Sequence, residues 1–352
     1  MGSNRLKPRP FFASALLLAS VAGVFILTPL APPQALAKEL QAPQLGLPIR
    51  CFLGKDCWLV NLVDVDPGPG RLDYTCSNRT YDGHKGTDIA IRDLKAMQRG
   101  VDVLASAPGV VKGVRDGMKD VDITLAGAPS VEGKECGNGL VLDHGGGWET
   151  QYCHMRRGSL AVRRGDVVKR RQKLGLVGNS GRAQFPHIHL SVRHENKVID
   201  PFVGLGRTDK CGLGPKPLWR EGALAKLSRT TTALYNAGFA TAKPQPRAAR
   251  EGLLGATELP RDAPALVLWV DVFWVEAGDV LGFRLRGPEG NTLIKRAAKI
   301  KKTHARRFTF VGKKRQQDLW PPGIYRGQIV LVRKDKAGAK QRFSIVREVE
   351  IR

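Results

Sequence analysis

Short apolar runs separated by glycine-rich turns fill the middle of this 352-residue chain and constrain its fold more than any other feature. Stretches with helical periodicity are scarce there. Runs of β-branched and small apolar residues bounded by glycine turns are typical of strands. The pattern therefore predicts a mainly β fold with an antiparallel β-sheet, in which residues 89–91 and the apolar run at 187–192 form strands.

The C-terminal part, residues 263–352, has a second β pattern and contains no cysteine. Gly, Pro and charged turns separate its β-branched and aromatic runs, which is typical of a small immunoglobulin-like or fibronectin-like β-sandwich. Its large aromatic residues are expected to pack in the core or at its edge rather than to form a binding platform. They are Trp269, Phe273, Trp274 and Trp320.

Four histidines and one aspartate supply the donors of a zinc site. His187 and His189 are two residues apart in an apolar run, so in a strand both side chains lie on one face. Gly83 precedes His84 and Gly86 lies between His84 and Asp88, which favours a tight loop over a helix. A catalytic zinc ion takes three nitrogen or oxygen ligands and keeps one open position. One imidazole of the pair could bind the metal while its neighbour transfers protons.

These motifs resemble the lysostaphin-type (LytM-type) zinc metallopeptidases. The resemblance rests on His-x-x-x-Asp at 84–88, Tyr-x-His-Met at 152–155 and His-x-His at 187–189, followed by Asp-Pro at 200–201. It covers roughly residues 80–204, a little over a third of the chain. It implies a lysostaphin-like antiparallel β-sheet and a peptidase that acts on peptidoglycan.

The resemblance also implies a role for each residue of the site. His84, Asp88 and His189 would bind Zn²⁺, while His154 and His187 would act as general base and as donors to the developing oxyanion. This is chemically coherent, because zinc acidifies water and imidazole titrates near neutral pH. No His-Glu-x-x-His occurs in the sequence, so a glutamate base of that type is absent.

Other interpretations of the reactive residues have less support. Cys153 adjoins His154, but neighbouring strand residues point to opposite faces, which argues against a nucleophilic pair. No Gly-x-Ser-x-Gly is present, so a serine hydrolase is not indicated. His144, His194 and His304 have no partner motif and are expected to be structural or solvated.

The N-terminal 37 residues have the layout of a secretory signal. Three basic residues precede an apolar run at 11–30, and Ala35-Leu-Ala37 offers a cleavage site. An uncleaved membrane anchor is the alternative, because the run is long enough to cross a bilayer. Either way the protein is expected to be exported, to the periplasm or beyond.

Export makes the six cysteines candidates for disulfides. Cys51 and Cys57 can close a small loop, and Cys136 and Cys153 flank a predicted hairpin. Six cysteines allow fifteen connectivities, and this choice leaves Cys76 to pair with Cys211. Zinc bound by cysteine is the competing interpretation, but the sequence has no Cys-x-x-Cys.

The net charge of +25 indicates an anionic partner. Because export is predicted, an anionic envelope polymer is favoured over nucleic acid, which is not expected as a partner. Membrane association is expected only if the signal stays uncleaved. Basic clusters at 156–173 and 295–315 are candidates for docking such a polymer, and solvated loops are the alternative.

The chain is thus divided into a signal (1–37), a Cys- and Pro-containing lead-in (38–79), a zinc metallopeptidase domain (80–220), a linker (221–262) and the β-sandwich (263–352). An insertion at about 115–138 is expected to wall one side of the site. The predicted function is exported zinc endopeptidase activity on peptidoglycan cross-links or stem peptides. The alternatives are a non-catalytic envelope protein that binds peptidoglycan or activates an amidase, and a zinc peptidase that acts on proteins.

Overall fold

The structure is a computed structural model that describes residues 1–2, 7–11, 42–125, 127, 129–206, 210–228, 231–316, 318–335 and 338–352. Its contacts divide the chain into two units, Met1–Glu39 and Leu40–Arg352. Most of the predicted signal lies outside the described residues, so the signal stays a prediction. Within the described part of the chain, none of the helices has the length and apolar character needed to span a bilayer.

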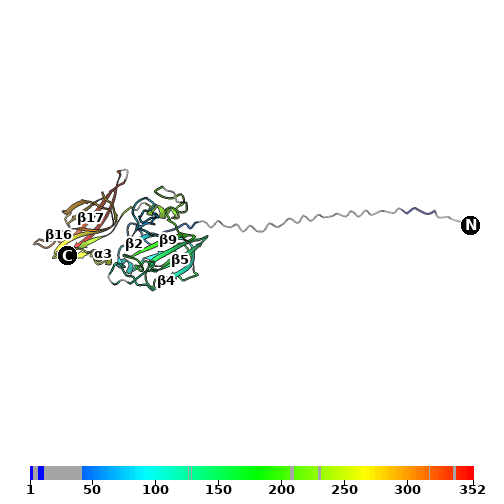
Figure 1. Cartoon of the computed structure of the whole chain (residues 1–352), viewed down its shortest axis with the longest axis horizontal. Helices are drawn as coiled ribbons and strands as arrows, with labels where there is room; N and C mark the ends of the chain where they lie inside the picture. The colour runs from blue at the N-terminus through cyan, green and yellow to red at the C-terminus, as the bar shows by residue number, and fades with distance from the viewer. Residues whose placement is uncertain are drawn as a thin grey trace. The chain divides into compact units, whose positions relative to one another are not determined.

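An eight-stranded antiparallel sheet forms the first half of the larger unit (Figure 1). Strand β9 (His187–His194) is an interior strand between β2 (Thr87–Ile91) and β6 (Trp148–Met155). The path continues from β2 to the edge strand β1 (Cys57–Asn61), and from β6 through β5 (Asn138–Gly145) and β4 (Gly109–Arg115) to β7 (Val167–Val168). Strand β10 (Lys197–Val198) pairs with β9, and β3 (Asp102–Leu104) with β8 (Lys173–Leu176) forms a separate ladder.

One short helix, α1 (Leu94–Arg99), follows β2. It begins where Asp93 accepts a hydrogen bond from the Ala96 N–H, and it ends at Gly100, whose φ of +88° an ordinary residue rarely adopts. The sheet packs on a buried core that includes Ile89, Tyr152 and Ile188, each fully buried. The mainly β fold predicted from the apolar runs is confirmed.

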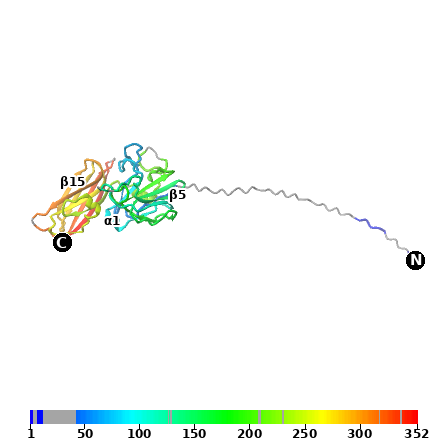
Figure 2. The ribbon, with the colours of Figure 1, turned by 60° about the horizontal axis from the view of Figure 1, so that its bottom comes forward.

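Two further sheets form the C-terminal half of the unit (Figure 2). The first has three strands in the order β11 (Ala233–Ala240), β13 (Ala265–Val275), β16 (His304–Lys314). The second has five, in the order β12 (Glu258–Leu259), β18 (Lys340–Ile351), β17 (Gly323–Lys334), β14 (Val280–Arg286), β15 (Thr292–Lys299), and only the β12–β18 pairing is parallel. Apolar residues of both sheets share one core, so the two sheets pack face to face.

Strand β11 and two short helices occupy the segment that the sequence suggests as a linker. The helices are α2 (Glu221–Leu227) and α3 (Pro246–Glu251). Strand β11 pairs with β13 from Ala233 to Ala240 and is buried along its length. Part of this segment is therefore built into the C-terminal sheet.

Strand β13 is buried on both faces. Leu266, Leu268, Val270 and Val272 point into the core between the two C-terminal sheets, while Phe273 points away from that core. Trp274 has a φ of +54° and joins Phe273 in a second apolar cluster. That cluster includes Trp58 of β1, so β13 links the C-terminal sheets to the first sheet.

Three disulfides are present, with the pairing proposed from the sequence: Cys51–Cys57, Cys76–Cys211 and Cys136–Cys153. Disulfides of this kind fit an extracytoplasmic location.

Removing the Cys76–Cys211 bond is expected to lower the free energy of unfolding by about 2–5 kcal/mol, because it constrains a long stretch of the unfolded chain. Its sulfurs join residues 135 positions apart, against 6 for Cys51–Cys57. Urea unfolding of the Cys76→Ser/Cys211→Ser double variant measures the loss. The Cys51→Ser/Cys57→Ser variant is the control, and a loss as large in the control would contradict the loop-length argument.

Candidate metal centre

The five residues singled out from the sequence come together around the central strands of the first sheet. Asp88 lies in β2 directly opposite His189 in β9, so both side chains lie on one face. His187 lies two residues earlier on that face. His84 precedes β2 in a loop, and His154 lies near the end of β6, next to the Cys153–His189 pair.

Three of these side chains converge on one point. Nε2 of His84 lies 3.1 Å from Nδ1 of His189 and 3.2 Å from Oδ2 of Asp88. Nδ1 of His189 lies 2.8 Å from Oδ1 of Asp88. His84 and Asp88 are 2% and 1% exposed. Two imidazole nitrogens and a carboxylate therefore face a shared position in a site largely withdrawn from water.

Further polar contacts hold the side chains of His84, Asp88 and His189 in place. Nδ1 of His84 lies 2.5 Å from the carbonyl oxygen of Leu62, and Nε2 of His189 lies 2.9 Å from Oγ of Ser191. The amide of Asn61 donates to Oδ2 of Asp88 at 2.8 Å. Such partners fix the ring orientation of metal-binding histidines and leave the inner nitrogen as the lone-pair donor.

Gly86 allows the close approach of His189. A Cβ at position 86 would lie 2.5 Å from Nε2 of His189 and 2.7 Å from the carbonyl oxygen of Leu190. A side chain there would push His189 out of place. The His-x-Gly-x-Asp spacing is thus a packing requirement as well as a loop signal.

His154 and His187 lie beside this centre with their rings 4.6 Å apart. Nδ1 of His154 is 2.8 Å from the carbonyl oxygen of Ser180, and Nδ1 of His187 is 2.8 Å from that of Phe185. If each Nδ1–H donates to its carbonyl, each Nε2 carries a lone pair. Nε2 of His187 lies 3.8 Å from Oδ1 of Asp88, so it faces the centre.

The backbone of His154 has a φ of +63°, which is uncommon for a residue with a side chain. Its N–H donates to the carbonyl of Cys136 at 2.8 Å, and Cys136 is tied to Cys153 by a disulfide. Neighbouring groups therefore hold His154 in this conformation, as is common at functional sites.

Burial and neighbouring charges set the protonation of the site. Burial opposes ionisation of Asp88, but His84 and His187 outweigh it and hold the pKa of Asp88 well below its usual range. Burial lowers the pKa of His189 and, with the neighbouring imidazoles, holds the pKa of His154 well below its usual value. His154 and His189 are therefore neutral near pH 7, with lone pairs free to bind a metal or accept a proton.

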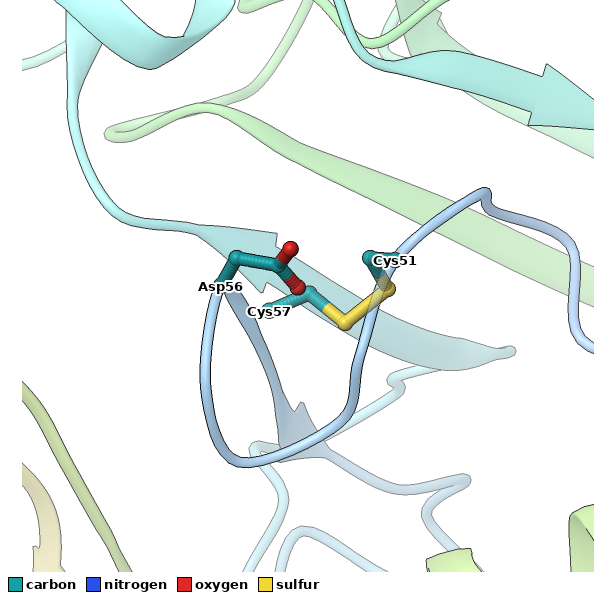
Figure 3. Close-up of side chains that lie close together, drawn as sticks. All are labelled: Cys51, Asp56 and Cys57. Atoms are coloured by element: carbon teal, nitrogen blue, oxygen red, sulfur yellow. A yellow bond between two sulfur atoms is a disulfide. The ribbon is translucent and has the colours of Figure 1, made fainter.

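A second group of donors, Cys51, Asp56 and Cys57, also lies close together (Figure 3). Both of its sulfurs are consumed in the Cys51–Cys57 disulfide, and Asp56 accepts a hydrogen bond from the Phe52 N–H at 2.6 Å. Thiolates are the form in which cysteine binds zinc, so this group does not suit the metal. The His84, Asp88 and His189 group fits zinc in the number, type and convergence of its donors.

Several supporting residues were not given a role from the sequence. The carboxylate of Asp120, in the 115–138 insertion, accepts hydrogen bonds from the N–H groups of Asn179 at 2.7 Å and Arg157 at 3.0 Å. Oγ of Ser180 accepts from the Asn138 N–H at 2.9 Å. The insertion thus lies against the segment that bonds His154. The Gly-Asn-Ser-Gly motif at 178–181 marks that segment, but its hydrogen bonds depend on strands far apart in the sequence.

Two histidines and a carboxylate brought together on an antiparallel β-sheet form a metal-binding type of site. Residues 82–201 match the family model described as Peptidase family M23, so this part of the chain is an M23 domain of the lysostaphin type.

Known relatives resemble parts of the chain. Over 64 residues, 39% are identical to peptidoglycan DD-endopeptidase ShyB of Vibrio cholerae, which is 18% of this chain and 15% of that protein. Over 159 residues, 31% are identical to DD-carboxypeptidase/endopeptidase Mpg of Neisseria meningitidis, which is 42% of this chain and 30% of that one.

Among solved structures, the catalytic domain of lysostaphin from Staphylococcus simulans matches with 22% identity and a TM-score of 0.24. That match covers 34% of this chain and 76% of the lysostaphin domain. The chain spans no more than 30% of the length of the two curated relatives.

Proposed function

We propose that this protein is a zinc-dependent endopeptidase that hydrolyses peptide bonds in peptidoglycan cross-links or stem peptides. The observation that carries the proposal is the convergence of His84, Asp88 and His189, with His154 and His187 beside them, within an M23 domain. ShyB is named as a peptidoglycan DD-endopeptidase, which supports the substrate class, and Mpg is named as a DD-carboxypeptidase/endopeptidase, which supports the reaction type.

In this proposal His84, Asp88 and His189 hold the zinc ion. A bound zinc ion supplies Lewis acidity, which polarises a peptide carbonyl and acidifies water. The low pKa of Asp88 keeps its carboxylate charged, and the neutral imidazole of His189 offers its inner nitrogen. The carbonyl of Leu62 orients the ring of His84 for the same purpose.

His154 and His187 would carry the protons. The free Nε2 of His154 can accept a proton from the attacking water, because its Nδ1 is bound to Ser180 and burial keeps the ring neutral. Once protonated, an imidazole becomes a donor that can stabilise the oxyanion or protonate the leaving amine. His187 is oriented in the same way by Phe185 and faces the same space.

Metal removal tests the proposal. The protein without its first 37 residues, treated with a chelator and then dialysed, is expected to release no peptides from purified sacculi, and one equivalent of zinc is expected to restore release. Released material is measured by liquid chromatography with mass spectrometry. Magnesium in place of zinc is the control, because this nitrogen-rich site does not suit an oxygen-preferring cation.

Two further assays of the zinc-loaded protein, binding to sacculi and cleavage of casein, separate the rival interpretations. A zinc-loaded protein that binds sacculi but releases nothing would favour a binding or amidase-activating role. Cleavage of casein at a rate comparable to that of sacculi would favour a general zinc peptidase.

A further inference from the structure

The side chain of Phe185 connects His187 to the C-terminal sheets. Its ring centroid lies 5.0 Å from that of His187 and 5.2 Å from that of Phe273 in β13. Its carbonyl oxygen lies 2.8 Å from Nδ1 of His187. Phe185 therefore contacts the imidazole through both its ring and its backbone.

Arg306 of β16 also contacts Phe185. Its guanidinium carbon lies 5.8 Å from the ring centroid of Phe185, 5.5 Å from that of Phe273 and 5.3 Å from that of Tyr235. A guanidinium within about 6 Å of an aromatic ring is attracted to its face. Arg306 thus contacts three rings at once, and one of them is the ring that touches His187.

The buried carboxylate of Asp271 holds Arg306 in place. Nε of Arg306 donates to Oδ1 of Asp271 at 3.0 Å, and Asp271 is fully buried. The hydroxyl of Tyr235 donates to the same carboxylate at 2.5 Å. A buried carboxylate is costly without a charged partner, so movement of Arg306 into solvent would leave Asp271 with the Tyr235 hydroxyl but without this cation.

This contact is part of a continuous apolar junction between the C-terminal sheet and the edge of the first sheet. The indole N–H of Trp274 donates to the carbonyl of Val60 in β1. Strand β1 pairs with β2, which carries Asp88. The buried residues of the junction are Trp58, Val60, Ala90, Ala233, Tyr235, Phe273 and Trp274, with Phe185 packed against them.

We propose that the C-terminal β region contributes to the active site by positioning one of its histidines, and that it is not an independent module. Phe273 and Arg306 hold Phe185, and Phe185 fixes the position of the His187 imidazole. Phe185 and Arg306 are thus positioning residues that act through His187. The effect on activity rests on the proposed function, whereas the placement of His187 can be measured without any activity.

Kinetics of full-length variants test the proposal. Phe185→Leu removes the ring and keeps an apolar side chain, and Arg306→Gln removes the cation. Both are expected to lower kcat on a soluble cross-linked muropeptide by about ten- to a hundredfold, with KM and zinc content unchanged, because small misplacements of a catalytic group slow the reaction. Phe185→Tyr, which keeps the ring, is expected to retain near wild-type kcat.

Arg326→Gln is the matched control. It removes the same charge, but from an arginine whose ion pair with Glu348 is exposed. If Arg306→Gln unfolds the protein because Asp271 is left unpaired, Arg306→Gln/Asp271→Asn replaces it. Thermal unfolding followed by circular dichroism establishes which variants are folded.

Nuclear magnetic resonance of protein labelled with ¹⁵N at histidine gives a readout independent of catalysis. The ring signals of His187 are assigned by their loss in His187→Ala. They are expected to shift in Phe185→Leu and Arg306→Gln and to stay in place in Arg326→Gln. Unmoved His187 signals in both folded variants would overturn the inference, whatever happens to kcat. A wild-type protein without peptidase activity would refute the proposed function and leave this readout intact.

Discussion

Replacing Asp88 with asparagine is expected to abolish zinc binding at micromolar concentration and to lower peptide release by about a thousandfold or more. Asp88 supplies the negative charge of the centre, and its carboxylate contacts both His84 and His189. The substitution keeps the shape of the side chain, so the loss would come from charge rather than from a cavity. Zinc content by atomic emission and release from sacculi measure the two effects.

Asp143→Asn is the control for Asp88. It removes one negative charge near the end of β5, where Asp143 accepts a hydrogen bond from the Gly145 N–H. It should leave zinc content and activity unchanged. Full zinc binding by the Asp88→Asn protein would mean that the metal is held elsewhere.

Replacing His154 with alanine is expected to lower kcat by about a hundred- to ten-thousandfold while zinc content stays at the wild-type level. His154 lies beside the centre but contributes no atom to the converging group of donors. The carbonyl of Ser180 lies 2.8 Å from Nδ1 of His154, which leaves Nε2 as the lone pair that would serve as general base in the proposed function. Steady-state kinetics on a soluble muropeptide, with zinc measured on the same sample, separates proton transfer from metal binding.

His194→Gln is the matched control for His154. His194 lies in the same sheet, and its ring packs on Trp148 with centroids 4.4 Å apart. Its loss should leave kcat near the wild-type value. Loss of zinc from His154→Ala would show instead that His154 is a ligand.

Local sequence pattern predicts the strands that build the site. The alternation in β9 puts His187 and His189 on one face, and the glycines before β2 predict the loop that carries His84. The alternation and the loop can be predicted because both depend on the steric preferences of residues that are close in sequence. Local patterns do not indicate which strands pair with one another. The order of the motifs indicates the pairing only because it resembles that of a known family.

The support of the site could not be predicted in the same way. Phe185 and Phe273 are far apart in sequence, and no local pattern indicates that they touch. Asp271 looks out of place in an apolar strand until Arg306 is found beside it. The left-handed φ of Trp274 reverses the face on which its side chain points, and β propensity gives no sign of it.

The basic run at residues 295–315 shows that composition alone does not predict the role of each basic residue. Most of its residues in β15 and β16 are exposed, as expected for charged side chains on a solvated face. One member, Arg306, is instead mostly buried and holds the junction with the first sheet. Charge counts alone cannot separate a docking residue from a structural one, because both depend on which face of a strand is covered.

The most direct test of the central claim is hydrolysis of a purified cross-linked muropeptide dimer in H₂¹⁸O by the zinc-loaded protein, with products analysed by mass spectrometry. We expect two peptide-bearing monomers, with one ¹⁸O in the new carboxylate of one of them, and no labelled product from His154→Ala on the same timescale. An uncut dimer, or label found only where the peptide joins the glycan, would contradict endopeptidase activity.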